Sequence, residues 1–81
     1  EIFFWGVHAS AEIDLVFQKN GRLYGIEVKY AQAPGFTSSM RMASEELALK
    51  HLWVVYPGSE AYALNKNMTV IPLTELRSIK F

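Results

Sequence analysis

The sequence contains no cysteine, no long apolar run and no glycine-rich phosphate-binding loop. Without cysteine, neither a disulfide bond nor a thiolate metal site can form, and this fits a protein of the reducing cytoplasm. The apolar runs are too short for a membrane-spanning helix, and the N-terminus does not resemble a secretion signal. We therefore expect a cytoplasmic domain with no membrane partner and with no ATP site of its own.

The sequence also lacks an excess of either charge. Eight lysine and arginine residues balance eight aspartate and glutamate residues, which gives a formal net charge of +0. Proteins that bind nucleic acid without sequence preference usually present a basic surface. Neutrality therefore counts against strong independent DNA binding by these 81 residues. The carboxylates of a metal site would themselves lower the net charge before any metal is bound.

Apolar residues, in contrast, are plentiful. They make up 51% of the 81 residues, which argues against disorder and predicts one small domain over residues 1–81. The chain begins at Glu1 without a methionine and continues directly into the aromatic stretch Ile2–Trp5. This start is typical of a domain excised from a longer protein.

The clearest local signal is a β-hairpin. The stretches Glu12–Lys19 and Arg22–Tyr30 both alternate polar and apolar residues, as half-buried strands do. Between them lies Asn20-Gly21, which favours a two-residue turn with positive φ at both positions. Such a turn fixes the pairing of the two strands, because Lys19 must then face Arg22.

This pairing gathers four charged residues. Asp14 is predicted to lie opposite Glu27, and Glu12 opposite Lys29. All four side chains point to one face, because strand side chains alternate with a period of two. The other face is predicted to be apolar, with Ile13, Leu15 and Phe17 against Val28, Ile26 and Tyr24.

Two directly opposed carboxylates repel each other, so the pair Asp14 and Glu27 needs an explanation. Either one carboxyl has a raised pKa or a cation lies between them. Mg²⁺ suits the second arrangement, since it takes one or two carboxylates, keeps several waters and accepts phosphate oxygens. Lys29 would then stand beside the metal, where it could hold or help deprotonate the attacking water or neutralise charge that develops on a phosphate. The alternative is an ordinary ion pair between Glu12 and Lys29 on a solvated face.

The residues Asp14 and Glu27-Val28-Lys29 resemble the signature of the PD-(D/E)XK nuclease superfamily, which has the restriction-endonuclease-like fold. The resemblance implies a Mg²⁺- or Mn²⁺-dependent phosphodiesterase that acts on DNA. Asp14 and Glu27 would be the metal ligands and Lys29 the catalytic lysine. Glu12 would be an auxiliary acid or a ligand of a second metal.

A closer resemblance covers most of the chain. The chain is similar to an uncharacterised domain at the C-terminus of bacterial and archaeal AAA+-type ATPases. The segments that carry the resemblance are F-F-W (3–5), A-E-I-D-L-V-F (11–17), G-I-E-V-K-Y (25–30), H-L-W-V-V-Y-P-G (51–58) and V-I-P-L (70–73). It implies that an ATPase domain precedes this one in the same protein. The chain departs from the pattern at Gly6 and Ser10, and the first helix of the nuclease fold is missing.

Two other functions remain open. One is a non-catalytic docking or regulatory module of the ATPase that keeps a nuclease-like fold. The other is a homodimer formed through the exposed first strand, Ile2–Val7. In the predicted hairpin arrangement Trp5 of that strand lies across from Asp14, where it would either stack on a base or pack over the sheet.

The remaining elements complete an α/β fold with a mixed sheet. We expect an antiparallel meander of three strands, one crossover helix and a further strand beside the meander. The later elements are a helix over Thr37–Leu49, a buried parallel strand over His51–Tyr56, a small hairpin of Ala61–Leu64 with Met68–Ile71, and a short helix over Leu73–Lys80.

Overall fold

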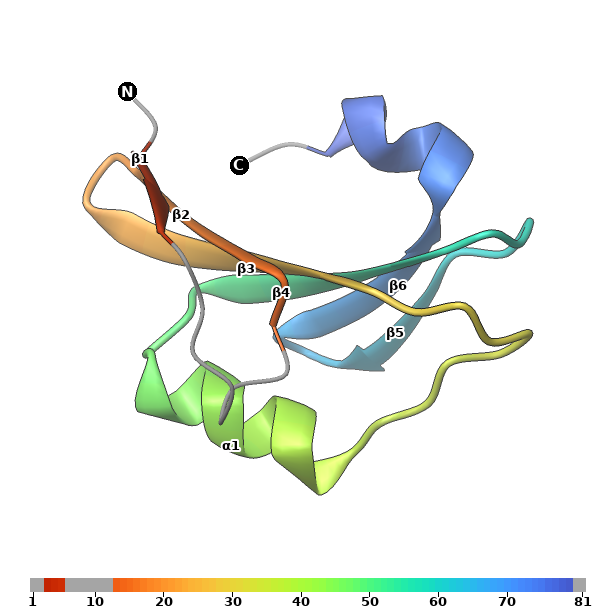
Figure 1. Cartoon of the computed structure of the whole chain (residues 1–81), viewed down its shortest axis with the longest axis horizontal. Helices are drawn as coiled ribbons and strands as arrows, with labels where there is room; N and C mark the ends of the chain where they lie inside the picture. The colour runs from red at the N-terminus through yellow and green to blue at the C-terminus, as the bar shows by residue number, and fades with distance from the viewer. Residues whose placement is uncertain (1–2, 6–12, 80–81) are drawn as a thin grey trace.

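A computed structural model describes the backbone of residues 3–5 and the whole of residues 13–79. It shows an α/β domain built on a mixed six-stranded sheet with the strand order β1-β2-β3-β4-β6-β5 (Figure 1). The elements are β1 (Phe3–Trp5), β2 (Leu15–Lys19), β3 (Arg22–Val28), α1 (Ser38–Glu46), β4 (His51–Tyr56), β5 (Tyr62–Asn65), β6 (Met68–Pro72) and the 3₁₀ helix η1 (Leu73–Ser78).

The hairpin of β2 and β3 confirms the predicted turn and pairing. Asn20 and Gly21 have φ angles of 55° and 77°, and Lys19 pairs with Arg22. The strand β2 begins only at Leu15, however, and not at Glu12 as predicted. It begins late because the backbone N–H of Asp14 bonds to a side chain of β3 and not to the backbone of β3. Glu12 itself lies outside the described residues.

The first strand completes the predicted antiparallel meander, but with a different pairing. Trp5 pairs with Val16, so the expectation that it lies across from Asp14 is wrong by two residues along β2. That expectation rested on a four-residue turn over residues 8–11, which lie outside the described residues. Within the described chain, β1 and β5 form the two edges of the sheet.

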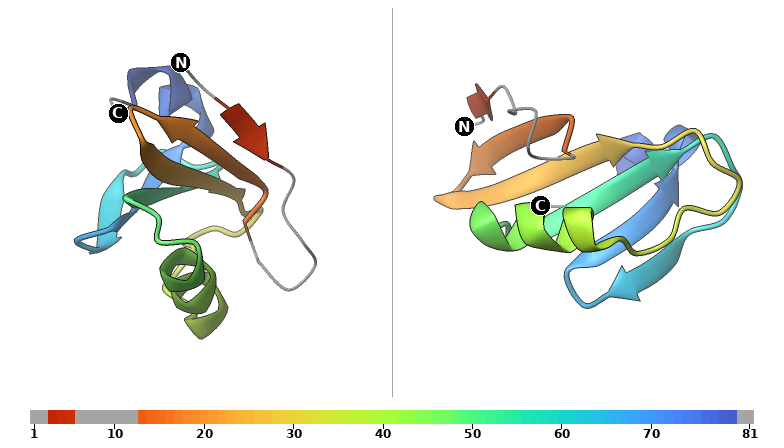
Figure 2. Two further views of the ribbon diagram at one scale, coloured as in Figure 1. Left: turned by 90° about the vertical axis from the view of Figure 1, so that its left-hand side faces the viewer. Right: turned by 60° about the horizontal axis from the view of Figure 1, so that its bottom comes forward.

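The helix α1 makes the predicted crossover from β3 to β4. Its N-terminus is capped by Thr37, whose hydroxyl oxygen accepts a hydrogen bond from the backbone N–H of Met40 at 3.1 Å. The strand β4 then runs parallel to β3, and β6 runs parallel to β4. The predicted second hairpin is also present, with β5 antiparallel to β6 at the sheet edge. Figure 2 shows α1 lying against the sheet from one side.

Two backbone hydrogen bonds from residues beyond the helix cap the C-terminus of α1. The N–H of Leu49 donates to the carbonyl of Ser44 at 3.0 Å, and the N–H of Ala48 donates to the carbonyl of Glu45 at 3.1 Å. This is the Schellman arrangement, in which the residue after the cap is usually glycine because it needs positive φ. Here the position is Ala48, with φ at 53°.

Both faces of the sheet carry apolar side chains. The core between the sheet and α1 contains Ile13, Val16, Met40, Ala43, Leu49, Leu52, Val54, Tyr56, Met68 and Val70. The opposite face carries Phe17, Tyr24, Trp53, Val55 and Ile71. The prediction that Ile13 shares a face with Leu15 and Phe17 is therefore wrong. Ile13 precedes β2, so the alternation of strand side chains does not extend to it. A short helix was predicted over Leu73–Lys80. The structure has the 3₁₀ helix η1 over Leu73–Ser78, and Lys80 lies outside the described residues. Figure 1 shows η1 on the side of the sheet away from α1.

Candidate functional site

Three of the four predicted site residues lie together at one end of the β2–β3 hairpin. Asp14 directly precedes β2, Glu27 is the penultimate residue of β3, and Lys29 directly follows β3. The pairing of Leu15 with Ile26 places Asp14 and Glu27 at the next position along the hairpin. The position of Glu12 relative to them lies outside the described residues.

Asp14 and Glu27 do not continue the backbone ladder but replace it with side-chain bonds. The N–H of Asp14 donates to Oε1 of Glu27 at 3.0 Å. In return, Oδ2 of Asp14 accepts the N–H of Val28 at 2.9 Å. Two backbone donors at the end of the hairpin are thus paired by carboxylate oxygens. The two carboxylates are held in place by these bonds.

Glu27 is buried, with only 6% of its surface exposed. It lies on the face of the sheet toward α1, because its strand neighbour at the i−2 position, Gly25, is packed against Leu49 and Leu52 of that core. Its second oxygen, Oε2, lies 3.1 Å from Nζ of Lys29. Lys29 is partly exposed, so the pair joins a buried carboxylate to an ammonium group that reaches solvent.

Burial is the main influence on the pKa of Glu27. It raises the pKa above the usual value because removal from water disfavours the charged form. The hydrogen bond and positive charge of Lys29 act in the opposite direction, whereas the neighbouring carboxylate of Asp14 raises the pKa further. The repulsion from Asp14 was expected from the sequence, but the burial of Glu27 was not. The sequence did contain one sign of this burial. Gly25 and Val16, which share the face of Glu27, are both uncharged.

These oxygen donors fit a hard divalent cation that takes few of its ligands from the protein. Asp14 and Glu27 supply two carboxylates, and Mg²⁺ commonly takes one or two and keeps several waters. Each carboxylate oxygen that accepts one hydrogen bond still has a second lone pair. Among residues 13–79, no group of three or more histidine and acidic side chains gathers at one point. Among the described residues, Asp14 and Glu27 are the carboxylates that would hold a cation at this site.

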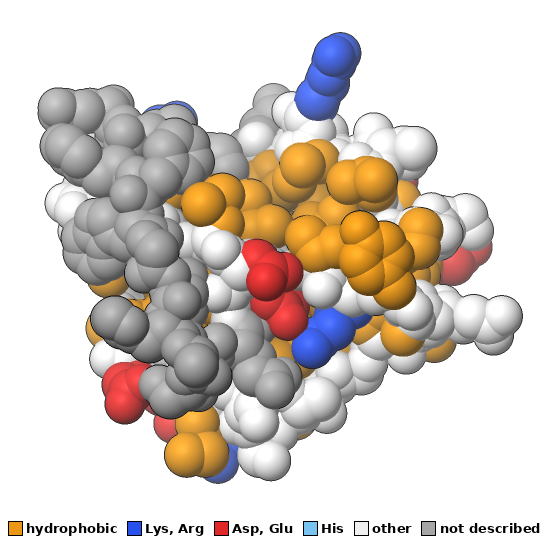
Figure 3. Space-filling view, in the orientation of Figure 1, with side chains coloured by type: hydrophobic (Ala, Val, Ile, Leu, Met, Phe, Trp, Pro, Cys, Tyr) orange, Lys and Arg blue, Asp and Glu red, His pale blue; other side chains and the backbone are white. Residues whose placement is uncertain are grey.

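The surface around the cluster is mixed. Figure 3 shows acidic and basic side chains side by side near the middle of one face, bordered by hydrophobic side chains. Next to Lys29 in the chain, Tyr30 is 88% exposed and Val28 is 37% exposed. Tyr30 is therefore an exposed aromatic residue one position along the chain from Lys29.

His51 is not part of this cluster. Its ring Nε2 lies 2.7 Å from the hydroxyl oxygen of Thr69 on β6. Its ring also stacks at a tilt on Trp53, with 4.7 Å between the ring centroids. Burial, followed by the positive charge of Lys50, lowers the pKa of His51. These contacts join the start of β4 to β6 and give His51 a structural role.

Comparison with known proteins shows the family. Residues 1–76 match the family described as a domain of unknown function, DUF4143. The chain belongs to that family. It is 33% identical over 75 residues to an uncharacterized protein of Mycobacterium bovis and, at the same identity and length, to one of Mycobacterium tuberculosis. The matches cover 93% of this chain and 17% of each relative, so the chain spans about a sixth of their length.

No solved structure matches the chain significantly. In the part of the family domain that the structure describes, no helix has the length and apolar character needed to cross a membrane.

Proposed function

We propose that this domain is a Mg²⁺-dependent phosphodiesterase of the restriction-endonuclease-like kind, with DNA as its substrate. The observation that carries the proposal is the convergence of Asp14, Glu27 and Lys29 at the end of one hairpin. Two carboxylates joined through hydrogen bonds to the hairpin backbone, one of them 3.1 Å from an ammonium nitrogen, are the kind of side chains that phosphodiester hydrolysis with a metal ion uses. The mixed sheet with one crossover helix agrees with such a core.

Asp14 and Glu27 would hold the cation. When bound, Mg²⁺ supplies a Lewis acid and a water of lowered pKa. Lys29 contributes from the protein side, because its ammonium group reaches solvent beside Glu27 and can neutralise negative charge that builds on a phosphate. The backbone of Lys29 is fixed by a hydrogen bond from its N–H to the carbonyl of Val55 at 2.9 Å. Glu12 would assist as an auxiliary acid.

The proposal includes an upstream ATPase domain as the partner in the same protein. The curated relatives are about six times as long as this chain, which leaves ample length for such a domain. DNA binding would then be shared with the rest of the protein. This division accounts for the balanced charge of the 81 residues.

A docking or regulatory module is the second candidate, and one observation favours it. Both oxygens of Glu27 and one of Asp14 are already engaged by the protein's own N–H and ammonium groups. A cluster with these bonds also closes the end of the hairpin without any metal. In that case the nuclease-like fold serves binding alone.

A metal titration separates the two candidates. Mn²⁺ or Mg²⁺ is titrated into wild type, Asp14→Asn and Glu46→Gln while the melting temperature and the heat of binding are recorded. The catalytic proposal expects wild type and Glu46→Gln to bind the metal and to melt higher with it, whereas Asp14→Asn does not. Glu46 is a suitable control because it is an exposed acid on α1. Equal responses from wild type and Asp14→Asn would end the metal hypothesis.

Turnover is tested by nicking of plasmid DNA, with the domain in the context of its whole protein. Lys29→Ala should abolish nicking, and Lys50→Ala should leave it unchanged because Lys50 is an exposed lysine outside the cluster. Metal binding without nicking by the whole protein would favour the docking module.

A further inference from the structure

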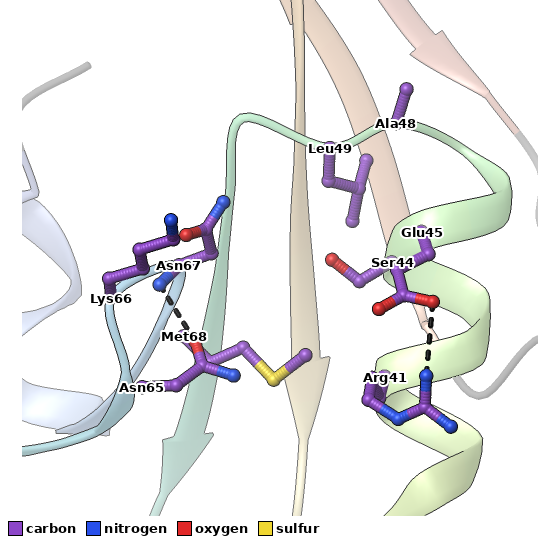
Figure 4. Close-up of a pocket in the computed structure, with 9 residues that line it drawn as sticks. All are labelled: Arg41, Ser44, Glu45, Ala48, Leu49, Asn65, Lys66, Asn67 and Met68. Carbon is purple, nitrogen blue, oxygen red and sulfur yellow. Dashed lines mark hydrogen bonds and ion pairs between the residues drawn. The ribbon is translucent and has the colours of Figure 1, made fainter.

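A second site lies in the cavity between α1 and the turn that joins β5 to β6. The cavity has a volume of about 340 Å³, which is within the range of small-molecule sites. Figure 4 shows its two walls, with Arg41 and Ser44 projecting from α1 and with Lys66 and Asn67 on the turn. This cavity is separate from the carboxylate cluster and does not depend on the proposed function.

The separation follows from the pairing of the strands. Met68, which lines the cavity, pairs with Leu52, whereas Glu27 pairs with Val54 two residues further along β4. Two strand spacings and two residues of strand length place Met68 roughly 12 Å from Glu27, measured between Cα positions. A small ligand in the cavity therefore does not reach the cluster.

Ser44 is the residue that marks the cavity as a binding site. Only Glu27 and Ser44 are both polar and buried among the described residues, each with 6% of its surface exposed. Glu27 has its partners within the protein. The hydroxyl of Ser44 forms no side-chain hydrogen bond with the described part of the chain, and its oxygen is not sealed from solvent. Ser44 lines the cavity and points toward the turn in Figure 4, so its hydroxyl is available to a ligand in the cavity.

The charged groups indicate the chemistry of the ligand. Arg41 and Lys66 bring positive charge from two different elements to opposite walls. Arg41 is paired with Glu45 at 3.1 Å, but both side chains are largely exposed, with 47% and 66% of their surfaces accessible. An exposed pair of this kind contributes little to stability, so an incoming oxyanion can take over one side of the guanidinium group. The guanidinium has five donors and uses one of them for Glu45.

The remaining walls are suited to the uncharged part of a ligand. Leu49 and Met68 are buried and form an apolar floor. Within the turn, the backbone N–H of Asn67 donates to Oδ1 of Asn65 at 2.7 Å. The side-chain amide of Asn67 adds a donor and an acceptor. We propose that the cavity binds a small organic oxyanion, a phosphate or a carboxylate, held by Arg41 and Lys66 and hydrogen-bonded by Ser44.

Binding is measured by NMR titration of the 81-residue chain, with backbone amide shifts recorded in the presence of a constant salt concentration. The probes are inorganic phosphate, succinate and, as an uncharged comparison, glycerol. The proposal expects phosphate or succinate to shift the amides of Ser44, Lys66 and Asn67 in a saturable manner, and glycerol to leave them unchanged. Whichever of the two anions binds more tightly shows whether the natural ligand carries a phosphate or a carboxylate.

Variants then test the assignment. Lys66→Gln and Ser44→Ala should each weaken binding of the preferred anion, by about tenfold where a charge-assisted bond is lost. Lys50→Gln removes the same charge from an exposed lysine outside the cavity and should leave the affinity unchanged. Ser44→Ala should fold normally, since its hydroxyl has no internal partner to lose. Equal affinities in wild type, Lys66→Gln and Ser44→Ala, or no saturable shift with either anion, would overturn the proposal.

Discussion

The side chain of Glu27 accepts the backbone N–H of Asp14 at 3.0 Å, at the point where the ladder between β2 and β3 stops. The bond joins the two acidic residues through the backbone of one and the carboxylate of the other. It holds Glu27 in a buried position, where the only described ammonium group in salt-bridge contact is that of Lys29. The stability of this end of the hairpin therefore depends on Lys29.

Replacing Lys29 with methionine should destabilise the domain in a pH-dependent manner. At neutral pH the variant leaves the buried charge of Glu27 without its ammonium partner, and we expect a loss of about 1–2 kcal/mol in the free energy of unfolding. At a pH below the raised pKa of Glu27 the carboxyl is protonated and the loss should shrink. Urea unfolding of wild type and Lys29→Met at both pH values measures this difference. A loss independent of pH would mean that Lys29 acts through packing alone.

Gly25 is predicted to be intolerant of even one methyl group. A Cβ at this position would lie 2.8 Å from Cδ1 of Leu49, 3.0 Å from Cδ1 of Leu52 and 3.2 Å from Cγ2 of Ile13. Gly25→Ala should cost about 1–3 kcal/mol of stability, since the side chains around it have to move. Gly35→Ala is the matched control, because a Cβ there meets no atom within 4 Å. Thermal unfolding should show a lower melting temperature for Gly25→Ala only.

Replacing Ala48 with glycine should stabilise the domain. The residue has φ at 53°, a conformation that costs an L-residue about 1–2 kcal/mol relative to glycine. We therefore expect Ala48→Gly to raise the free energy of unfolding by about 0.5–1 kcal/mol, after the greater entropy of an unfolded glycine is subtracted. The same change at Ala43, inside α1, should have the opposite sign. Chemical denaturation of both variants checks the contrast.

His51 should make the domain less stable in mild acid. Its pKa in the folded state is lowered from the usual value of 6.5, so the unfolded chain binds the proton more readily. Stability is then complete above 6.5 and falls as the pH drops from 6.5 through the lowered pKa. His51→Gln should remove this part of the pH dependence. Urea midpoints between neutral and mildly acid pH test it, and parallel curves for the two proteins would contradict it.

Much of the fold was predictable because local signals fixed it. The positive φ angles that Asn20-Gly21 favours set the pairing of β2 and β3, and this pairing in turn brought Asp14 next to Glu27. Likewise, the continuous apolar run from His51 to Tyr56 predicted a parallel strand covered on both faces. In these segments the sequence pattern and the tertiary packing require the same structure.

The rest depended on contacts that no local pattern encodes. Where β2 begins is decided by a side chain thirteen residues away, when Glu27 takes the N–H of Asp14. That early end of the ladder moved Ile13 to the other face and left Glu27 buried. The cavity beside Ser44 was equally hidden, because it forms between a helix and a turn that are distant in sequence. A serine within a helix gives no sign of facing such a space.

The strand β3 changes partners at its last residue. On one side β4 continues to pair, because the N–H of Lys29 donates to the carbonyl of Val55. On the other side the N–H of Val28 donates to the carboxylate of Asp14. A cation that draws Asp14 away would leave this N–H to solvent. The exchange rate of the Val28 amide hydrogen therefore reports which partner Asp14 has. Faster exchange in the presence of Mg²⁺ would mean that the Asp14 carboxylate has left this N–H for the metal. An unchanged rate would mean that Asp14 keeps its hydrogen bond to Val28.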